Sequence, residues 1–178
     1  LVNDADAGVL GERFFGERTP DDLVYLTIST GIGACVCVDG QVLSGWDGNA
    51  GEVGHFTVDP GGTLRCGCGG HGHWEAYCSG ANIPAFARHI HGTAGVPTEL
   101  PLEDLDAAAV FDAADRDPLA ARVLERVGRL NAQGVADVVH AYAPLIVHVG
   151  GAVALSNPER VLDPIRERLP ELVVSNVP

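Results

Sequence analysis

Apolar and polar positions along the first third of the chain predict a hairpin of β-strands that continues into a short third strand. Two apolar runs are separated by a glycine-rich segment, residues 30–33, which is typical of a hairpin tip. Asp39 and Gly40 then form a tight-turn dipeptide before the next apolar residues. The strands expected in this region are residues 23–29, 34–38, 41–43 and 53–58.

The remainder of the chain changes to helical spacing. The clearest helix has Asp117 as N-cap and Pro118 in its first position, and its apolar residues keep a helical period as far as Tyr142. A continuous apolar run, residues 145–149, suits a buried parallel strand. The other elements expected are helices at residues 75–79, 83–89, 105–114 and 157–169, and a last strand at residues 172–177.

The order of these elements indicates the fold class. A helix is also expected over residues 3–15, because Asn3 and Asp4 are good N-cap residues. A ribonuclease-H-like α/β domain has this order of elements: a hairpin, a third strand, helices, a strand, a helix and a strand. Such a domain has a mixed sheet whose antiparallel strands come first and whose parallel strands come last. A chain of 178 residues has the size of one domain of this kind.

Composition limits the partners of this segment. Acidic residues number 24 against 11 basic residues, all of them arginine, so the net charge is −13. A phosphate backbone needs positive charge on its partner, which argues against direct nucleic-acid binding. The acidic, lysine-free composition resembles that of proteins from salt-accumulating halophiles. No apolar run has the length of a membrane span, and 5 cysteines favour a reducing cytoplasm over a disulfide framework.

A cluster of soft ligands predicts a metal site. Cys66, Cys68 and His73 lie in one glycine-rich run, and His55 precedes it. Glycine allows the backbone to turn tightly enough for all four side chains to face one centre, and two thiolates with two imidazoles suit a structural Zn²⁺ site. His71 competes with His73 for the fourth position. The alternative is a glycine-rich surface turn whose cysteines and histidines have no common role.

Several motifs together resemble the ROK family of repressors and sugar kinases, and most of all its glucokinases. They are, in family order, residues 3–5 (Asn-Asp-Ala), 27–33 (Thr-Ile-Ser-Thr-Gly-Ile-Gly), 48–55 (Gly-Asn-Ala-Gly-Glu-Val-Gly-His), the Cys66–Glu75 loop and Gly150-Gly151. The resemblance implies an ATP-dependent sugar kinase with an actin-like ATPase fold, which uses Mg²⁺ with ATP and assembles as a homodimer or homotetramer. His73 stands where the family usually has a third cysteine.

The resemblance also assigns roles to individual residues on the sugar side. Asp4 matches the catalytic base that accepts the proton of the attacking sugar hydroxyl, although the residues alone indicate a helix cap. Asn3, Glu52, His55 and Glu75 match the residues that bind sugar hydroxyls. Without the family pattern, either glutamate reads as a solvated surface charge.

On the nucleotide side the resemblance assigns two glycine motifs. Thr30, Gly31 and Gly33 would bring backbone N–H groups and a hydroxyl to the ATP phosphates. Gly150 and Gly151, after a buried strand, would let adenosine approach closely. Alone, a Gly-x-Gly hairpin is more often just a turn, and the Gly150-Gly151 motif reads equally well as an ordinary strand-to-helix turn.

We expect residues 1–178 to be the C-terminal large domain of such a kinase. Residues 1–16 would form a helix at the domain junction, and residues 51–80 would form the sugar-binding and zinc loop. The small domain and a closing C-terminal helix are expected outside this chain, so the isolated chain should be inactive. Glucose, converted to glucose 6-phosphate in the cytoplasm, is the expected substrate. The alternatives are a sugar-sensing repressor without kinase activity and an inactive fragment.

Overall fold

Four strands form a mixed sheet at one end of the molecule. The computed structural model describes residue 8, residue 11 and residues 20–174. The sheet has the order β3-β2-β1-β4. Its strands are β1 (Leu23–Ile28), β2 (Ile32–Val38), β3 (Gln41–Val42) and β4 (Ile146–Gly150). β2 is antiparallel to both β1 and β3, whereas β4 is parallel to β1, with Thr27 opposite Gly150. The predicted mixed α/β architecture is therefore confirmed.

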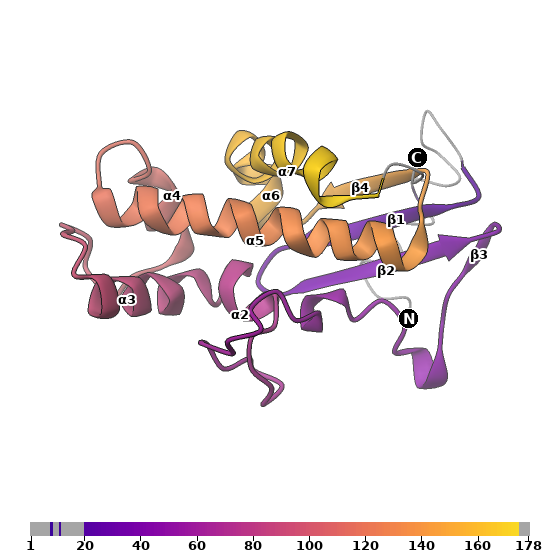
Figure 1. Ribbon diagram of the computed structural model, residues 1–178, viewed down its shortest axis with the longest axis horizontal. Coiled ribbons are helices and arrows are strands. Elements are labelled where there is room, and N and C mark those ends of the chain that lie inside the picture. The colour runs from indigo at the N-terminus through magenta and orange to yellow at the C-terminus, as the bar shows by residue number, and fades with distance from the viewer. Residues whose placement is uncertain (1–7, 9–10, 12–19, 175–178) are drawn as a thin grey trace.

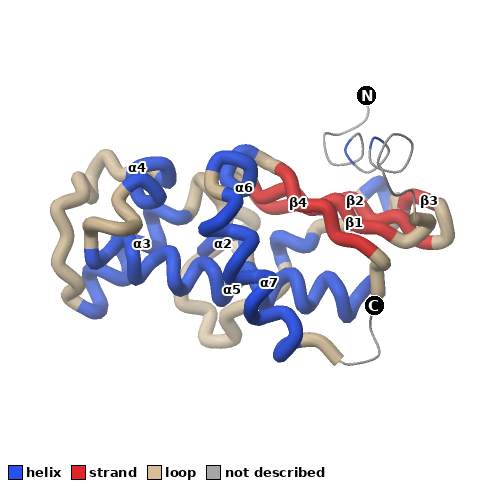
Figure 2. Tube along the Cα trace, turned by 90° about the horizontal axis from the view of Figure 1, so that it is seen from above, coloured by secondary structure: helices blue, strands red, loops and turns tan. Residues whose placement is uncertain are grey.

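Helices cover the sheet and extend the molecule beyond it. The 25-residue helix α5 runs from the sheet to the opposite end of the molecule, where α3 and α4 lie (Figures 1 and 2). α7 packs along α5 beside β4. The helices are α2 (Glu75–Cys78), α3 (Ile83–Ala94), α4 (Ala107–Asp112), α5 (Pro118–Tyr142), α6 (Ala152–Ser156) and α7 (Pro158–Leu172), and 3₁₀ turns occupy η1 (Trp46–Gly48) and η2 (Val53–His55).

Asp117 begins α5 as its sequence position predicts. Its carboxylate accepts hydrogen bonds from the backbone N–H groups of Leu119 and Ala120, and also from Thr98 Oγ1 and Glu99 N. Burial opposes ionisation of Asp117, but these hydrogen bonds outweigh it and hold its pKa below the ordinary value. The cap therefore fixes both the start of α5 and the preceding loop.

The core lies between one face of the sheet and α5. Val24, Leu26 and Ile28 alternate along β1 and join this core, while Leu23 and the intervening Tyr25 pack with Cys35 and Cys37 on the opposite face. β1 is thus buried on both sides. Among the described residues, no helix is both long and apolar enough to cross a membrane.

Three expectations about strands differ from the structure. Residues 53–58 were expected to form a strand, but Val53–His55 forms a 3₁₀ turn folded against β2. β4 is parallel as expected yet only half-buried along most of its length, since β1 is its one neighbour in the sheet of described residues. Leu172, expected to start a strand, ends α7 instead. Val173 and Val174 form no strand, and the end of the expected strand, residues 175–177, lies outside the described residues, as do Asn3, Asp4 and most of the expected N-terminal helix.

Candidate functional site

Four side chains from residues 55–73 meet at the predicted metal site. The ligand atoms of His55, Cys66, Cys68 and His73 all lie within 4.8 Å of one another. His55 Nδ1 is 3.8 Å from Cys66 Sγ, and His73 Nδ1 is 3.3 Å from Cys68 Sγ. Around a tetrahedral Zn²⁺, nitrogen and sulfur ligands are about 3.3–3.8 Å apart. The donor set and these two nitrogen–sulfur distances therefore suit a structural zinc ion.

The thiols of this cluster differ in their exposure. Cys66 is buried, whereas Cys68 is exposed. Burial raises the pKa of the Cys66 thiol, and the neighbouring Cys68 and Glu75 raise it further by charge repulsion, although a backbone hydrogen bond from Cys68 opposes this. The raised pKa favours the protonated thiol. A bound cation would lower the pKa again, because it stabilises the thiolate.

His71 does not join the cluster. Its Nδ1 lies 3.3 Å from the carbonyl oxygen of Gly62, and its backbone pairs with Arg65 in an isolated β-bridge. The loop thus turns back on itself between Arg65 and His71, which directs His71 to the outside. The geometry favours His73 as the fourth ligand.

Asp59 and Tyr77 hold the base of this loop. Asp59 accepts hydrogen bonds from the backbone of Gly61 and Thr63 and from the Tyr77 hydroxyl, which lies 2.6 Å away. Tyr77 in turn accepts a hydrogen bond from Leu64 N. These contacts fix the chain on the approach to Cys66. Neither residue was among the candidates from the sequence, although Asp59 opens an Asp-Pro-Gly-Gly turn that signals a loop start.

Trp74 anchors the other end of the loop in the core. Its side chain is fully buried, and its indole N–H donates to Asn131 Oδ1 of α5 over 2.8 Å. Gly134, one turn further along α5, leaves room for the ring, since a methyl group there would lie 2.3 Å from it. Because Trp74 stands between His73 and Glu75 in the chain, its burial fixes the position of both.

Glu52 and His55 are positioned by close contact between a glycine-rich turn and β2. A side chain at Gly51 would meet the carbonyl oxygen of Ala34 at 2.1 Å, and one at Gly54 would meet that of Ile32 at 2.2 Å. The turn η2, which contains Gly54, directs His55 Nδ1 toward Cys66, while His55 Nε2 lies 3.7 Å from Glu52 Oε2. One ring nitrogen of His55 therefore faces the metal cluster and the other faces Glu52.

Glu75 links the metal loop to the glycine-rich hairpin tip. Its carboxylate accepts a hydrogen bond of 2.9 Å from the backbone N–H of Ile32. A side chain at Gly31 would lie only 2.7 Å from the same oxygen. The carboxylate thus rests directly on the turn formed by residues 30–33.

The second glycine motif meets this turn at the carboxyl ends of β1 and β4. Gly80 N donates to the carbonyl oxygen of Ser29, and the Ser29 hydroxyl lies 3.4 Å from Ala152 N. Gly151 has a positive φ of 91° and passes so close to Ile28 that a side chain would lie 2.5 Å from its carbonyl oxygen. Ligands of open α/β sheets bind in the crevice outside the carboxyl ends of the strands. The hairpin tip and the Gly150-Gly151 turn lie at those carboxyl ends.

The predicted residues thus fall into two connected groups among the described part of the chain. Glu52, His55 and Glu75 lie with the metal cluster, and Thr30, Gly31, Gly33, Gly150 and Gly151 lie at the strand ends. The contact between Glu75 and Ile32 joins the two groups.

Comparisons with known proteins agree with this arrangement. A family model described as "ROK family" matches residues 1–178. The glucokinase of Aeropyrum pernix is 43% identical over 178 residues, covering 94% of this chain and 55% of that protein. A ROK family glucokinase from Streptomyces griseus, solved in complex with glucose and AMPPNP, is 32% identical with a TM-score of 0.79, covering 98% of this chain and 58% of that one.

A solved ROK family transcriptional regulator, a homologue of the E. coli MLC protein, is similar to the same extent. It is 32% identical to this chain with a TM-score of 0.80, covering 97% of this chain and 44% of that one. The chain spans about half the length of the relatives it matches. With the family model matched from the first residue to the last, this chain belongs to the ROK family.

Proposed function

We propose that this chain forms the sugar- and nucleotide-binding domain of an ATP-dependent hexose kinase, and that its substrate is glucose. The observation that carries the proposal is the position of Glu75, which belongs to the metal loop and also touches the hairpin tip. A kinase must bring a sugar hydroxyl and the γ-phosphate together, and such a link between the two binding regions serves that purpose. The glucokinases among the relatives support glucose as the sugar.

On the sugar side, three groups would bind hydroxyls. The carboxylates of Glu52 and Glu75 can each accept hydrogen bonds from two neighbouring hydroxyls. His55 would present Nε2, the nitrogen that faces Glu52, while Nδ1 faces the metal cluster. A Zn²⁺ ion held by His55, Cys66, Cys68 and His73 would fix the tautomer and direction of the His55 ring. Asn3 is proposed as a further hydroxyl ligand.

On the nucleotide side, the Thr30–Gly33 tip would cradle the ATP phosphates with backbone N–H groups and the Thr30 hydroxyl. Gly150 and Gly151 would leave space for adenosine beside the strand ends. Mg²⁺ would enter with ATP and neutralise the transferring phosphoryl group. Asp4 would accept the proton of the attacking hydroxyl. We further propose that the protein acts in the cytoplasm as a homodimer or homotetramer.

The second candidate is a sugar-sensing transcriptional regulator. The similarity to the ROK family regulator, which is as close as that to the glucokinase, is the observation that favours it. Such a protein would bind sugar through the same domain and would not turn it over.

The two functions are separated by measuring sugar-dependent ADP release. The assay uses the complete protein that carries this chain, loaded with zinc and supplied with Mg-ATP, and a panel of glucose, fructose, mannose and N-acetylated hexoses. The kinase predicts release that depends on the sugar and is greatest with glucose. Saturable sugar binding without ADP release on any sugar would support the regulator instead.

A further inference from the structure

A cavity of about 270 Å³ lies behind the metal loop, between the loop base and the helices α3 and α5. Its lining has two parts. One is apolar and consists of Val58, Phe86, Leu130 and the ring of Tyr77, which meets Phe86 edge to face at 5.1 Å. The other is polar and consists of His89, Arg126 and Arg129, with Asp59 and Thr63 at the loop side. The size suits a small molecule rather than a peptide.

The arginines at this cavity are a local exception in a strongly acidic chain. The chain has a net charge of −13 and only 11 basic residues, yet two of them line one cavity. Arg126 and Arg129 are three residues apart on α5, so their side chains emerge on the same face of the helix. Two neighbouring guanidinium groups repel each other, and a shared anion removes that repulsion.

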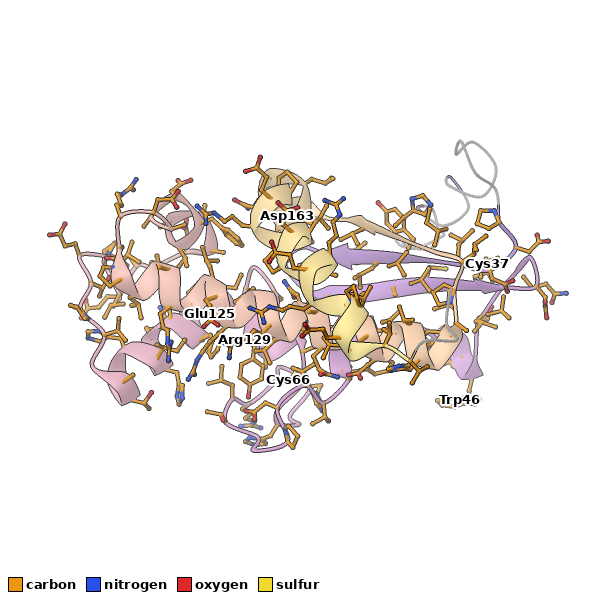
Figure 3. All side chains as sticks on the ribbon, turned by 45° about the horizontal axis from the view of Figure 1, so that its top comes forward. Cys37, Trp46, Cys66, Glu125, Arg129 and Asp163 are labelled. Carbon is orange, nitrogen blue, oxygen red and sulfur yellow. The ribbon has the colours of Figure 1, made fainter. Side chains whose placement is uncertain are left out.

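The partners of the two arginines differ. Arg129 Nε forms an ion pair of 2.6 Å with Glu125 Oε1, one turn earlier on α5. Figure 3 shows Arg129 on the side of α5 toward Cys66. Among the residues that the structure describes, none forms a hydrogen bond or ion pair with the Arg126 guanidinium. Arg126 therefore has all its donors available for a ligand.

Asp59 also lines the cavity and would repel an anion placed beside it. Its carboxylate is already engaged by three donors, namely Gly61 N, Thr63 N and the Tyr77 hydroxyl. Tyr77 consequently has no free proton to offer a ligand. An anionic group is therefore favoured at the α5 side of the cavity, with the uncharged part of the molecule over Phe86 and Leu130.

We propose that this cavity binds a small organic anion with an apolar body. Its phosphate or carboxylate group would be held by Arg126 and Arg129, since guanidinium forks match both groups. Its body would cover the Phe86 ring and Leu130. The site is separate from the sugar and nucleotide groups described above and shares none of their residues. It contacts the metal loop through Asp59 and Thr63, so occupation would restrain the base of that loop.

The test is calorimetric titration of the complete, zinc-loaded protein with three probes that share one ring: phenyl phosphate, benzoate and the neutral benzyl alcohol. We expect saturable binding of at least one anion and none of the alcohol. Arg126→Gln and Arg129→Gln should each weaken that binding by about tenfold or more, the effect of losing one charge-assisted hydrogen bond. The tighter of the two anions identifies the preferred head group.

Arg122→Gln is the matched control, because Arg122 is exposed on the same helix and does not line the cavity. It removes the same charge and should change the affinity less than about twofold. The proposal is overturned if neither anion saturates by about 10 mM. It is also overturned if Arg126→Gln has no larger effect than Arg122→Gln, because the anion then binds elsewhere or only through net charge.

Discussion

The backbone N–H of Ile32 donates a 2.9 Å hydrogen bond to Glu75 Oε2 across 43 positions of sequence. Ile32 belongs to the hairpin tip proposed to bind ATP phosphates, and Glu75 to the loop proposed to bind sugar. Glu52 also lies at the metal cluster, beside His55, but among the described residues its side chain forms no hydrogen bond to the hairpin tip. The two glutamates therefore differ in one respect that can be measured.

The first prediction compares Glu75→Ala with Glu52→Ala in the complete protein. Both substitutions remove a proposed sugar contact and should raise the KM for glucose by about tenfold or more. Only Glu75→Ala also frees the Ile32 N–H, so it alone should raise the KM for ATP and lower kcat. Steady-state kinetics with each substrate varied in turn measures the difference. An unchanged KM for ATP in Glu75→Ala would contradict a link between the two binding regions.

The second prediction concerns the metal. Cys68→Ser removes one of the four clustered ligands and should abolish stable zinc binding, whereas His71→Ala should leave it intact, because His71 contacts Gly62 instead. Mass spectrometry of the metal content should give about one zinc per chain for the wild type and His71→Ala. Equal zinc content in Cys68→Ser and the wild type would show that these residues do not form the site.

The third prediction tests how Trp74 is seated. Gly134→Ala places a methyl group 2.3 Å from the indole ring and should destabilise the fold by about 1–3 kcal/mol. Gly92→Ala is the matched change on α3, where the new methyl group would meet no atom within 4 Å beyond the adjoining residues and backbone of its own helix. It should be neutral or stabilise by up to about 1 kcal/mol, because alanine favours the helix. Urea unfolding measures both, and equal effects would mean that the Trp74 contact does not limit the packing of α5.

The fourth prediction follows from the hydrogen bond between Tyr77 and Asp59. That bond, with burial of the carboxylate opposing it, lowers the pKa of Asp59 from 3.8 to about 2. Burial of the phenol is the larger cause, and the same hydrogen bond the second, of a rise in the pKa of Tyr77 from 10.0 to about 12. A lowered carboxyl pKa stabilises the fold above pH 4 and loses that effect as the pH falls toward 2. A raised phenol pKa stabilises it below pH 10 and loses that effect as the pH rises toward 12.

Tyr77→Phe removes the bond and should cost about 0.5–1.5 kcal/mol at neutral pH. The difference in unfolding free energy between wild type and Tyr77→Phe should therefore be greatest between pH 4 and 10 and shrink on both sides. Taking the difference cancels any pH dependence that both proteins share, including loss of zinc. A difference in unfolding free energy that stays constant from pH 2 to 12 would contradict a hydrogen bond between Tyr77 and an ionised Asp59.

The sequence was sufficient for features that depend on neighbouring residues. The β1–β2 hairpin is confirmed, because its signal consists of two apolar runs around a glycine-rich tip. The cap of α5 is confirmed for the same reason, since Asp117 and Pro118 act on the turn that follows them. The clustering of His55, Cys66, Cys68 and His73 was also expected from the sequence, because glycine spacing makes their approach possible, and that they bind a metal stays a prediction. The choice of His73 over His71 depended on a β-bridge that spacing alone does not show.

Contacts between distant segments could not be predicted. The Trp74–Asn131 and Glu75–Ile32 hydrogen bonds join residues 57 and 43 positions apart, so they depend on the packing of the loop against α5 and β2. Residues 53–58 were expected to form a strand because their apolar residues, Val53, Phe56 and Val58, suit a strand as well as a turn. The turn at residues 53–55 results from Gly51 and Gly54, whose missing side chains let the segment fold onto the backbone of β2.

The most direct measurement is the formation of glucose 6-phosphate by the complete protein with Mg-ATP and glucose, for the wild type and for Asp4→Ala. A hexose kinase with Asp4 as its base predicts one ADP released for each glucose 6-phosphate formed. It also predicts that Asp4→Ala still binds glucose but loses about 10²-fold or more of this rate. Glucose binding by a folded, zinc-loaded wild type that forms no glucose 6-phosphate would contradict the kinase and favour the regulator.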